Sequence, residues 1–230
     1  MQLKTLLEDV DYQLVQGNVE QEISALIYDS RKAAPGAVFV CICGAVRDGH
    51  DFAAEVTQNG CPVLIVQRDV DVAEDVTVIR VEDTRLALAQ TSAAFFGHPA
   101  RELTTIGITG TKGKTTAAFM LQSIIKAAGE SCGMIGSVST DDGIECYEST
   151  NTTPEAPEVW RHIANCRTSG RQSMVMEVSS QALKYQRVEN LPFDVACFLN
   201  IGRDHISPIE HPTFEDYFES KLRIFDQAKT

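Results

Sequence analysis

The feature that most constrains this chain is a glycine-rich segment, T-I-G-I-T-G-T-K-G-K-T-T, at residues 105–116. Gly110 and Gly113 allow the backbone to curl so that several N–H groups point inward at one anion. A helix that begins after the glycines adds the positive end of its dipole. Lys114 then supplies a mobile positive charge for the outer phosphates, and Thr115 supplies a hydroxyl for Mg²⁺. The segment therefore predicts a nucleoside triphosphate site on a strand–loop–helix unit.

The strict pattern for such a loop, G-x-x-x-x-G-K-[ST], is missed by one place, because Ile108 stands where its first glycine belongs. The alternative is a glycine-rich turn ahead of an amphipathic helix. The string G-K-T at a strand-to-helix junction favours the phosphate site.

The rest of the chain predicts an α/β fold in two domains, residues 1–100 and 101–230, because short apolar runs alternate with helical patterns. The turn signal Gly97-His98-Pro99 separates them. The expected strands are 37–43, 62–66, 76–81, 103–109, 173–178 and 195–199, the last two as central strands; the expected helices are 83–96, 114–128 and a final one with an inward stripe of Phe214, Phe218, Leu222 and Phe225. Such a fold has a mainly parallel sheet, with ligand sites at the carboxyl ends of its strands.

Composition excludes several classes of protein. Twenty Lys and Arg against 32 Asp and Glu give a net charge of −12, so wrapping of a nucleic acid is not expected. No apolar stretch is long enough to cross a bilayer, and the first residues do not resemble a signal peptide. Seven scattered cysteines predict reduced thiols in a cytoplasmic protein. Cys41 and Cys43 alternate on an expected strand and are expected to be core or half-buried thiols and not metal ligands.

Polar residues that follow the later strands are candidates for chemistry. Glu177 ends the expected strand 173–178, where a carboxylate commonly holds Mg²⁺ directly or through water. The alternative is a carboxylate that is favoured by a helix dipole. Asp204 and His205 follow the next strand, and His205 is either functional or a satisfied structural histidine. The other four histidines are expected to be structural.

Two further features have an ordinary structural explanation. Lys221 borders the apolar face of the final helix, where a lysine usually extends to solvent. The turn Asn151–Pro154 precedes a helix, with Pro154 at its first position and Thr153 as the N-cap. Ligand recognition is the less economical interpretation of both.

Taken together, five ordered strings resemble the Mur ligase family, and within it the MurE type, the UDP-N-acetylmuramoyl-tripeptide synthetases. The strings are GITGTKGKTT, NTTPEA, MEVSSQAL, NIGRDH and YFESKLRIF. The N-terminal YDSRKAAPGAVFVCICG is similar to that family's uridine-nucleotide domain, so the likeness covers nearly the whole chain. It implies a small α/β UDP-muramoyl domain followed by an incomplete ATP-binding domain.

The resemblance also implies an activity. The family adds an amino acid to a UDP-muramoyl peptide in peptidoglycan synthesis: ATP phosphorylates the terminal carboxylate, and the amine displaces phosphate. ATP would be held by Gly110, Thr111, Lys112, Gly113, Lys114, Thr115 and Thr116. The metal sites would be formed by Thr115, Glu177, His205 and Lys221, the last as a carbamate. The UDP-muramoyl dipeptide would contact Ser30, Asn151, Thr152, Thr153, Ser179 and Arg187.

There are departures from the family pattern. Lys112 stands where the family often has Asn, Gln181 replaces a common His, and Tyr185 stands where Gln is frequent. They affect details of substrate contact. The chain also ends soon after the matched lysine, before the region that would select lysine or diaminopimelate. We therefore expect an N-terminal portion, monomeric, that does not complete ligation alone; product formed by the purified chain would contradict this.

Two other functions stay open at this point. One is another ligase of the superfamily, such as a folylpolyglutamate-type enzyme, which the string DSR and the string SSQAL disfavour. The other is a non-catalytic nucleotide-binding module. The presence of G-K-T-T together with Glu177, His205 and Lys221 disfavours that module, because a site that has lost its catalytic activity does not require all of these residues.

Overall fold

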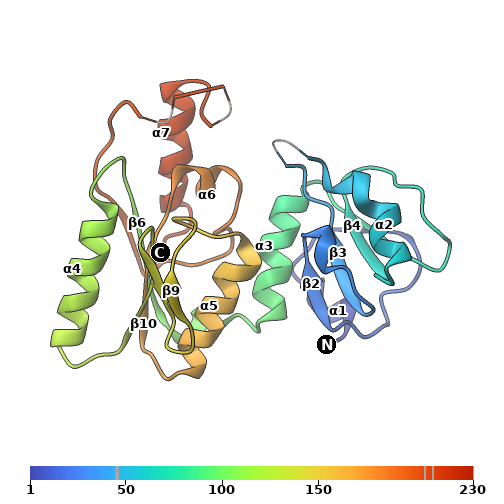
Figure 1. Ribbon diagram of the computed structural model, residues 1–230, viewed down its shortest axis with the longest axis horizontal. Coiled ribbons are helices and arrows are strands. Elements are labelled where there is room, and N and C mark those ends of the chain that lie inside the picture. Colours follow the sequence, from blue (N-terminus) through green and yellow to red (C-terminus); the bar gives the residue numbers. More distant parts are fainter. Residues whose placement is uncertain (45–46, 205, 209, 230) are drawn as a thin grey trace. The chain divides into compact units, whose positions relative to one another are not determined.

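The computed structural model describes residues 1–44, 47–204, 206–208 and 210–229, and it divides the chain into two compact units, Met1–Gly97 and His98–Thr230. Both units are α/β (Figure 1). Within the described ranges, no helix is both long and apolar enough to cross a membrane.

The first unit contains a five-stranded sheet in the order β1-β5-β4-β3-β2. Only β1, at one edge, is antiparallel to its neighbour. Every residue of β3 and β4 is buried, as expected for parallel strands covered on both faces. The elements are α1 (Leu3–Leu6), β1 (Gln13–Gln16), β2 (Ala25–Ile27), η1 (Ser30–Lys32), β3 (Ala37–Val40), η2 (Gly49–Phe52), α2 (Ala53–Gln58), β4 (Val63–Val66), β5 (Thr77–Arg80) and α3 (Thr84–Phe95).

The strand expected at residues 37–43 is too long, because it ends at Val40. The N–H of Ile42 donates to the carbonyl of Val40 (3.0 Å), which turns the chain out of the sheet. Cys41 is buried and Cys43 is exposed, both beyond the strand. The apolar run therefore continues past the end of the strand.

The second unit contains a six-stranded sheet in the order β11-β6-β10-β7-β8-β9. The first four strands are parallel, and β8 and β9 form an antiparallel hairpin at one edge. Helices α4 and α5 cover opposite faces (Figure 1). The elements are η3 (Pro99–Glu102), β6 (Thr104–Thr109), α4 (Lys114–Ala127), β7 (Cys132–Ile135), β8 (Ser139–Asp141), β9 (Cys146–Glu148), α5 (Ala156–Thr168), β10 (Ser173–Glu177), α6 (Ser180–Lys184), β11 (Val195–Phe198), α7 (Phe214–Leu222) and η4 (Arg223–Phe225).

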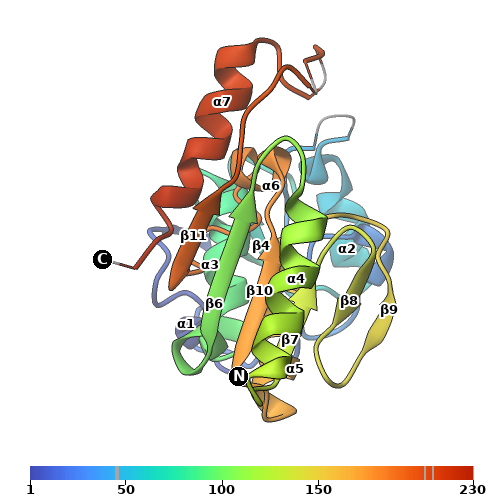
Figure 2. The ribbon, with the colours of Figure 1, turned by 90° about the vertical axis from the view of Figure 1, so that its left-hand side faces the viewer.

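One of the two strands expected to be central, β11, is at the edge of the described sheet. Figure 2 shows β6 and β10 inside the sheet, with β11 beyond β6. Val195, its first residue, is 50% exposed, and Leu199, which directly follows its last residue, is 38% exposed. An apolar run alone does not distinguish a central strand from an edge strand with exposed apolar side chains.

The final helix presents a different face from the one expected. Tyr217, Lys221 and Ile224 are buried, whereas Phe218 and Phe225 are 36% and 49% exposed. Tyr217, Lys221 and Ile224 stand at i, i+4 and i+7, and Phe218, Leu222 and Phe225 have the same spacing, so the spacing could not decide between the two faces. The hydrogen bonds of Tyr217 and Lys221 to the glycine loop explain why this face of the helix is buried and the phenylalanine face is not.

Candidate functional site

The glycine loop connects β6 to α4 and has the geometry expected of it. Gly110 has φ +151° and Gly113 has φ +85°, backbone conformations that favour glycine. The Lys114 ammonium donates to the carbonyl oxygen of Gly110 (2.9 Å). Burial lowers the pKa of Lys114. The loop thus places the Lys114 ammonium beside the first N–H groups of α4, which have no partner within the helix.

Glu177 lies at the carboxyl end of β10 and is 1% exposed. Its carboxylate accepts from the Thr115 hydroxyl (2.8 Å), from the Ser137 N–H (2.8 Å) and from the Ser137 hydroxyl (3.2 Å). These donors satisfy a buried carboxylate. The hydroxyl and carboxylate oxygens are also the type of ligand that Mg²⁺ prefers.

Ser137 belongs to this cluster although sequence analysis did not select it. It follows β7, and its hydroxyl is also 2.9 Å from that of Thr152. The rule that led to Glu177, that polar residues after parallel strands gather at one edge, would have identified Ser137 as well. It was missed because its strand, C-G-M-I, is short and contains a glycine.

Lys221 is 1% exposed, so the interpretation of a lysine that extends to solvent is wrong. Its ammonium donates to the carbonyl of Gly110 (3.0 Å) and lies 4.7 Å from the centre of the Tyr217 ring. Burial and, to a lesser extent, the charge of Lys114 lower the pKa of Lys221 to about 7, against an opposing effect of Asp204. Two lysines from distant parts of the chain therefore meet at one loop carbonyl.

A cavity of about 260 Å³ opens beside these lysines. It brings together most of the residues expected to contact substrate. Its lining comprises Lys114, Thr150, Asn151, Thr152, Thr153, Ser179, Ser180, Gln181, Arg187, Glu210 and Lys221. Thr150, Ser180 and Glu210 were not selected from the sequence, because no motif chemistry distinguishes them.

The sequence predicted Thr153 as a helix N-cap, and this is wrong. Helix α5 begins at Ala156, and its N-cap residue is Glu155. Instead, the Thr153 hydroxyl donates to the carbonyl of Glu177 (2.9 Å) and accepts from the N–H of Ser179 (3.0 Å). Arg187 donates to the carbonyl of Thr153 (3.1 Å) and pairs with Glu155 at 2.8 Å. Thr153 therefore ties the polar turn to the end of β10.

Three expected site residues lie outside this cluster. Thr116, in the first turn of α4, is exposed. Ser30 is in the first unit and lines a separate cavity of about 500 Å³ with Tyr28 and Arg31. His205 falls outside the described residues, so the expected carboxylate–histidine–lysine group is described only for Glu177 and Lys221.

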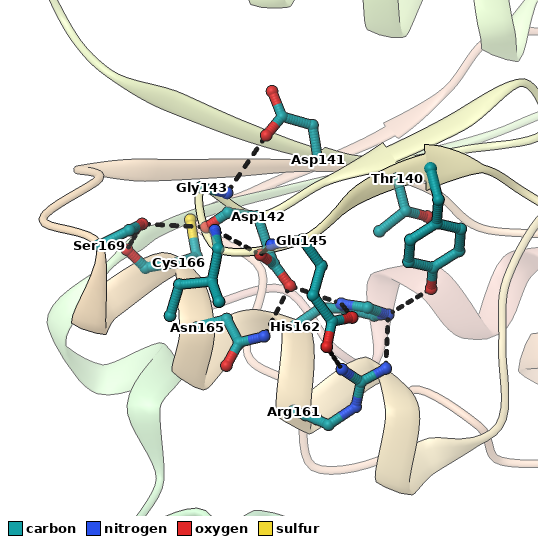
Figure 3. A network of polar contacts seen from close by, with 12 residues as sticks. Thr140, Asp141, Asp142, Gly143, Glu145, Arg161, His162, Asn165, Cys166 and Ser169 are labelled. Carbon is teal, nitrogen blue, oxygen red and sulfur yellow. Dashed lines mark hydrogen bonds and ion pairs between the residues drawn. The ribbon is translucent and has the colours of Figure 1, made fainter.

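A second buried polar network lies at the β8–β9 turn (Figure 3). Asp142 accepts from the N–H groups of Ile144 (2.9 Å) and Glu145 (2.7 Å) and from Asn165 (2.9 Å), and it lies 2.7 Å from Nδ1 of His162. Asp142, Glu145 and His162 are close enough to hold a metal ion. These hydrogen bonds satisfy the Asp142 carboxylate without one, and they anchor the hairpin to α5.

Comparison with known proteins gives consistent results over both units. A model of the Mur ligase middle domain matches residues 108–230, and a model of the Mur ligase family catalytic domain matches residues 22–96. The chain is 42% identical to the UDP-N-acetylmuramoyl-L-alanyl-D-glutamate–2,6-diaminopimelate ligase of Clostridium perfringens. The matched region is 99% of this chain and 47% of that relative. It thus spans about half the length of the curated relatives that it matches.

Solved structures agree with the fold. A structure of a UDP-N-acetylmuramoyl-L-alanyl-D-glutamate–2,6-diaminopimelate ligase matches this chain with a TM-score of 0.82 and 21% identity. The match covers 100% of this chain and 46% of that one. MurF ligase from Thermotoga maritima, in complex with ADP, matches with a TM-score of 0.60 and 25% identity. This match covers 89% of this chain and 43% of the MurF chain. These matches confirm the α/β fold with mainly parallel sheets. Since one family model covers more than half of its residues, the chain belongs to the Mur ligase family.

Proposed function

We propose that this chain forms the substrate-binding and ATP-binding portion of an amide ligase that joins 2,6-diaminopimelate to UDP-N-acetylmuramoyl-L-alanyl-D-glutamate in peptidoglycan synthesis. The carrying observation is the cavity in which Lys114 of the phosphate loop, the buried Lys221 and Arg187 face a common space. The choice of diaminopimelate rather than lysine rests on the names of the relatives. The reaction belongs to the cytoplasm, where its nucleotide substrates are made.

Each unit has its own part in this proposal. Residues 1–100 bind the UDP-muramoyl end of the substrate, where Ser30 lines a cavity. Residues 101–230 bind ATP and the reacting carboxylate. A folylpolyglutamate-type enzyme would instead bind a folate, so binding of UDP-N-acetylmuramoyl dipeptide and not of a folate distinguishes the two ligases.

The described residues suit ATP and magnesium. Thr115 and Glu177 would hold Mg²⁺ through oxygen atoms, and the ion would neutralise the phosphate oxygens during transfer. Lys221 would add an anionic oxygen as a carbamate, and His205 would belong to the same metal sites. Burial favours this modification, because a pKa of about 7 leaves a substantial fraction of Lys221 as the neutral amine that combines with carbon dioxide.

The protein's own residues supply positioning and charge. Lys114 directs its ammonium at the inside of the loop, where the outer phosphates of ATP are expected. Arg187 and the hydroxyls of Thr152 and Ser179 line the same cavity and would orient the carboxylate that accepts the phosphoryl group. The diaminopimelate amine then displaces phosphate from the acyl phosphate.

The proposal is tested by titrating the purified chain with Mg·ATP and with UDP-N-acetylmuramoyl-L-alanyl-D-glutamate, and by repeating the Mg·ATP titration with K114A. We expect the wild-type chain to bind both ligands and K114A to lose Mg·ATP binding. K126A, which changes an exposed lysine in the last turn of the same helix, serves as the control. Equal Mg·ATP affinity of K114A and wild type would refute the assigned site.

A further inference from the structure

The first half of the phosphate loop is paired with the segment that follows β11. The N–H of Leu199 donates to the carbonyl of Thr109 (3.0 Å), and the N–H of Thr111 donates to the carbonyl of Asn200 (3.1 Å). Strand-like pairing thus continues past the ends of both strands and into the loop. The N–H of Thr111 is thereby engaged.

The side chain of Asn200 extends this pairing by one residue. Its amide oxygen accepts from the N–H of Lys112 (3.0 Å), and its amide nitrogen donates to the carbonyl of Lys112 (3.0 Å). Both polar backbone groups of Lys112 are therefore bound by one side chain. Asn is well suited to this position because its amide carries a donor and an acceptor side by side, as a backbone does.

The hydroxyl of Thr111 is held from two directions. It accepts from the N–H of Gly202 (2.9 Å) and from the hydroxyl of Tyr217 (3.1 Å), and it donates to the carbonyl of Gly202 (3.4 Å). A threonine hydroxyl has one proton and two lone pairs, so these contacts use all of its capacity. Tyr217 is fully buried on α7, which makes it a fixed anchor.

We propose that Asn200 and Tyr217 are positioning residues of the phosphate loop, and that Thr111 and Lys112 are anchors that do not contact phosphate. The phosphates would then be bound by the N–H groups of residues 113–116 and by Lys114, because the first amides of α4 have no partner within the helix. The inference rests on the proposed function, and it limits the phosphate-binding part of the loop to residues 113–116.

Hydrogen exchange of the chain without nucleotide tests the anchoring itself. We expect N200A to raise the exchange rates of the Thr111 and Lys112 amides about 5- to 30-fold above wild type, as two lost hydrogen bonds predict. Y217F, which removes one hydrogen bond of the Thr111 hydroxyl, should have a smaller effect at the same amides. T111V, which removes all three hydrogen bonds of that hydroxyl, should have an effect of the same order as N200A. T111S keeps the hydroxyl and should restore the wild-type rates. Unchanged rates in N200A would overturn the inference.

Titration with Mg·ATP tests the consequence for binding. N200A and T111V should each weaken affinity about 5- to 30-fold, and Y217F should weaken it less. The double variant T111V/Y217F should equal T111V alone, because T111V already removes the hydrogen bond that Y217F removes. N59A, which changes an exposed asparagine of the first unit, should bind as wild type.

The outcomes separate this inference from the proposed function. If Thr111 contacted phosphate directly, T111V would weaken binding while Y217F would not, and the inference would be wrong. Failure of the wild-type chain to bind Mg·ATP would refute the proposed nucleotide site. Anchoring would then be decided by hydrogen exchange alone.

Discussion

At the scale of single residues, Lys221 combines almost complete burial with proximity to the charge of Lys114. Its pKa is about 7 in the folded chain and near 10.5 when unfolded. Between these values the unfolded chain holds a proton that the folded chain lacks. The free energy of unfolding therefore increases as pH rises from 7 to 10.5, and the cost of burying the charge is fully present below pH 7.

Replacement of this lysine should reveal that cost. We expect K221M to raise the free energy of unfolding at pH 6 by about 1–3 kcal/mol and to reduce its increase between pH 7 and 10. Urea unfolding at several pH values measures both effects, with K126M as an exposed control. Parallel pH profiles for wild type and K221M would contradict the expectation.

Glu177 provides a second test at this scale. E177A leaves the Ser137 N–H and the Thr115 hydroxyl without their acceptor, so we expect a loss of about 1–3 kcal/mol in the free energy of unfolding. It should also abolish the dependence of nucleotide binding on Mg²⁺, since the carboxylate is the proposed ligand. ATP titrations with and without Mg²⁺ measure this. A full Mg²⁺ effect in E177A would place the metal elsewhere.

At the scale of elements, the glycine loop and the presence of the final helix were predictable, and the buried face of that helix was not. Gly110, Gly113 and Lys114 depend on local backbone chemistry, which sequence displays directly. The burial of Tyr217 and Lys221 depends on hydrogen bonds to a loop more than 100 residues away, and this face has the same spacing as the more apolar phenylalanine face. The edge position of β11 was hidden for the same reason, because sheet order is a tertiary property.

The β8–β9 hairpin shows how such an element is stabilised. Asp142 is fully buried, and its pKa is lowered because the hydrogen bonds that it accepts, together with His162, outweigh desolvation. Its contribution to stability is therefore present above the ordinary aspartate pKa and is lost as pH falls through the lower, folded value.

We expect D142N to lower the free energy of unfolding at pH 7 by about 1–3 kcal/mol, and the difference from wild type to shrink toward pH 3. D71N, at an exposed aspartate of the first unit, is the matched control. Thermal unfolding at pH 7 and pH 3 gives both values. An equal loss at the two pH values would mean that the ionised state of Asp142 contributes nothing.

At the scale of the whole chain, the net charge of −12 opposes the binding of anions, whereas Lys114 and Arg187 attract them inside one cavity. The two effects act over different distances. The screening length is about 30 Å at 0.01 M salt and about 8 Å at 0.15 M, so low salt lets an approaching nucleotide experience the net charge. High salt screens that repulsion but leaves short-range contacts within the cavity largely intact.

We therefore expect the association rate constant of Mg·ATP to increase, by less than about tenfold, as salt rises from 0.01 to 0.15 M. Stopped-flow mixing with a fluorescent ATP analogue measures this rate constant separately from dissociation. Basic nucleotide-binding surfaces show the opposite sign, because their long-range field attracts the ligand. A rate constant that falls with salt would mean that Lys114 and Arg187 dominate the field beyond the protein surface, and that local charge steers the ligand as well as holding it.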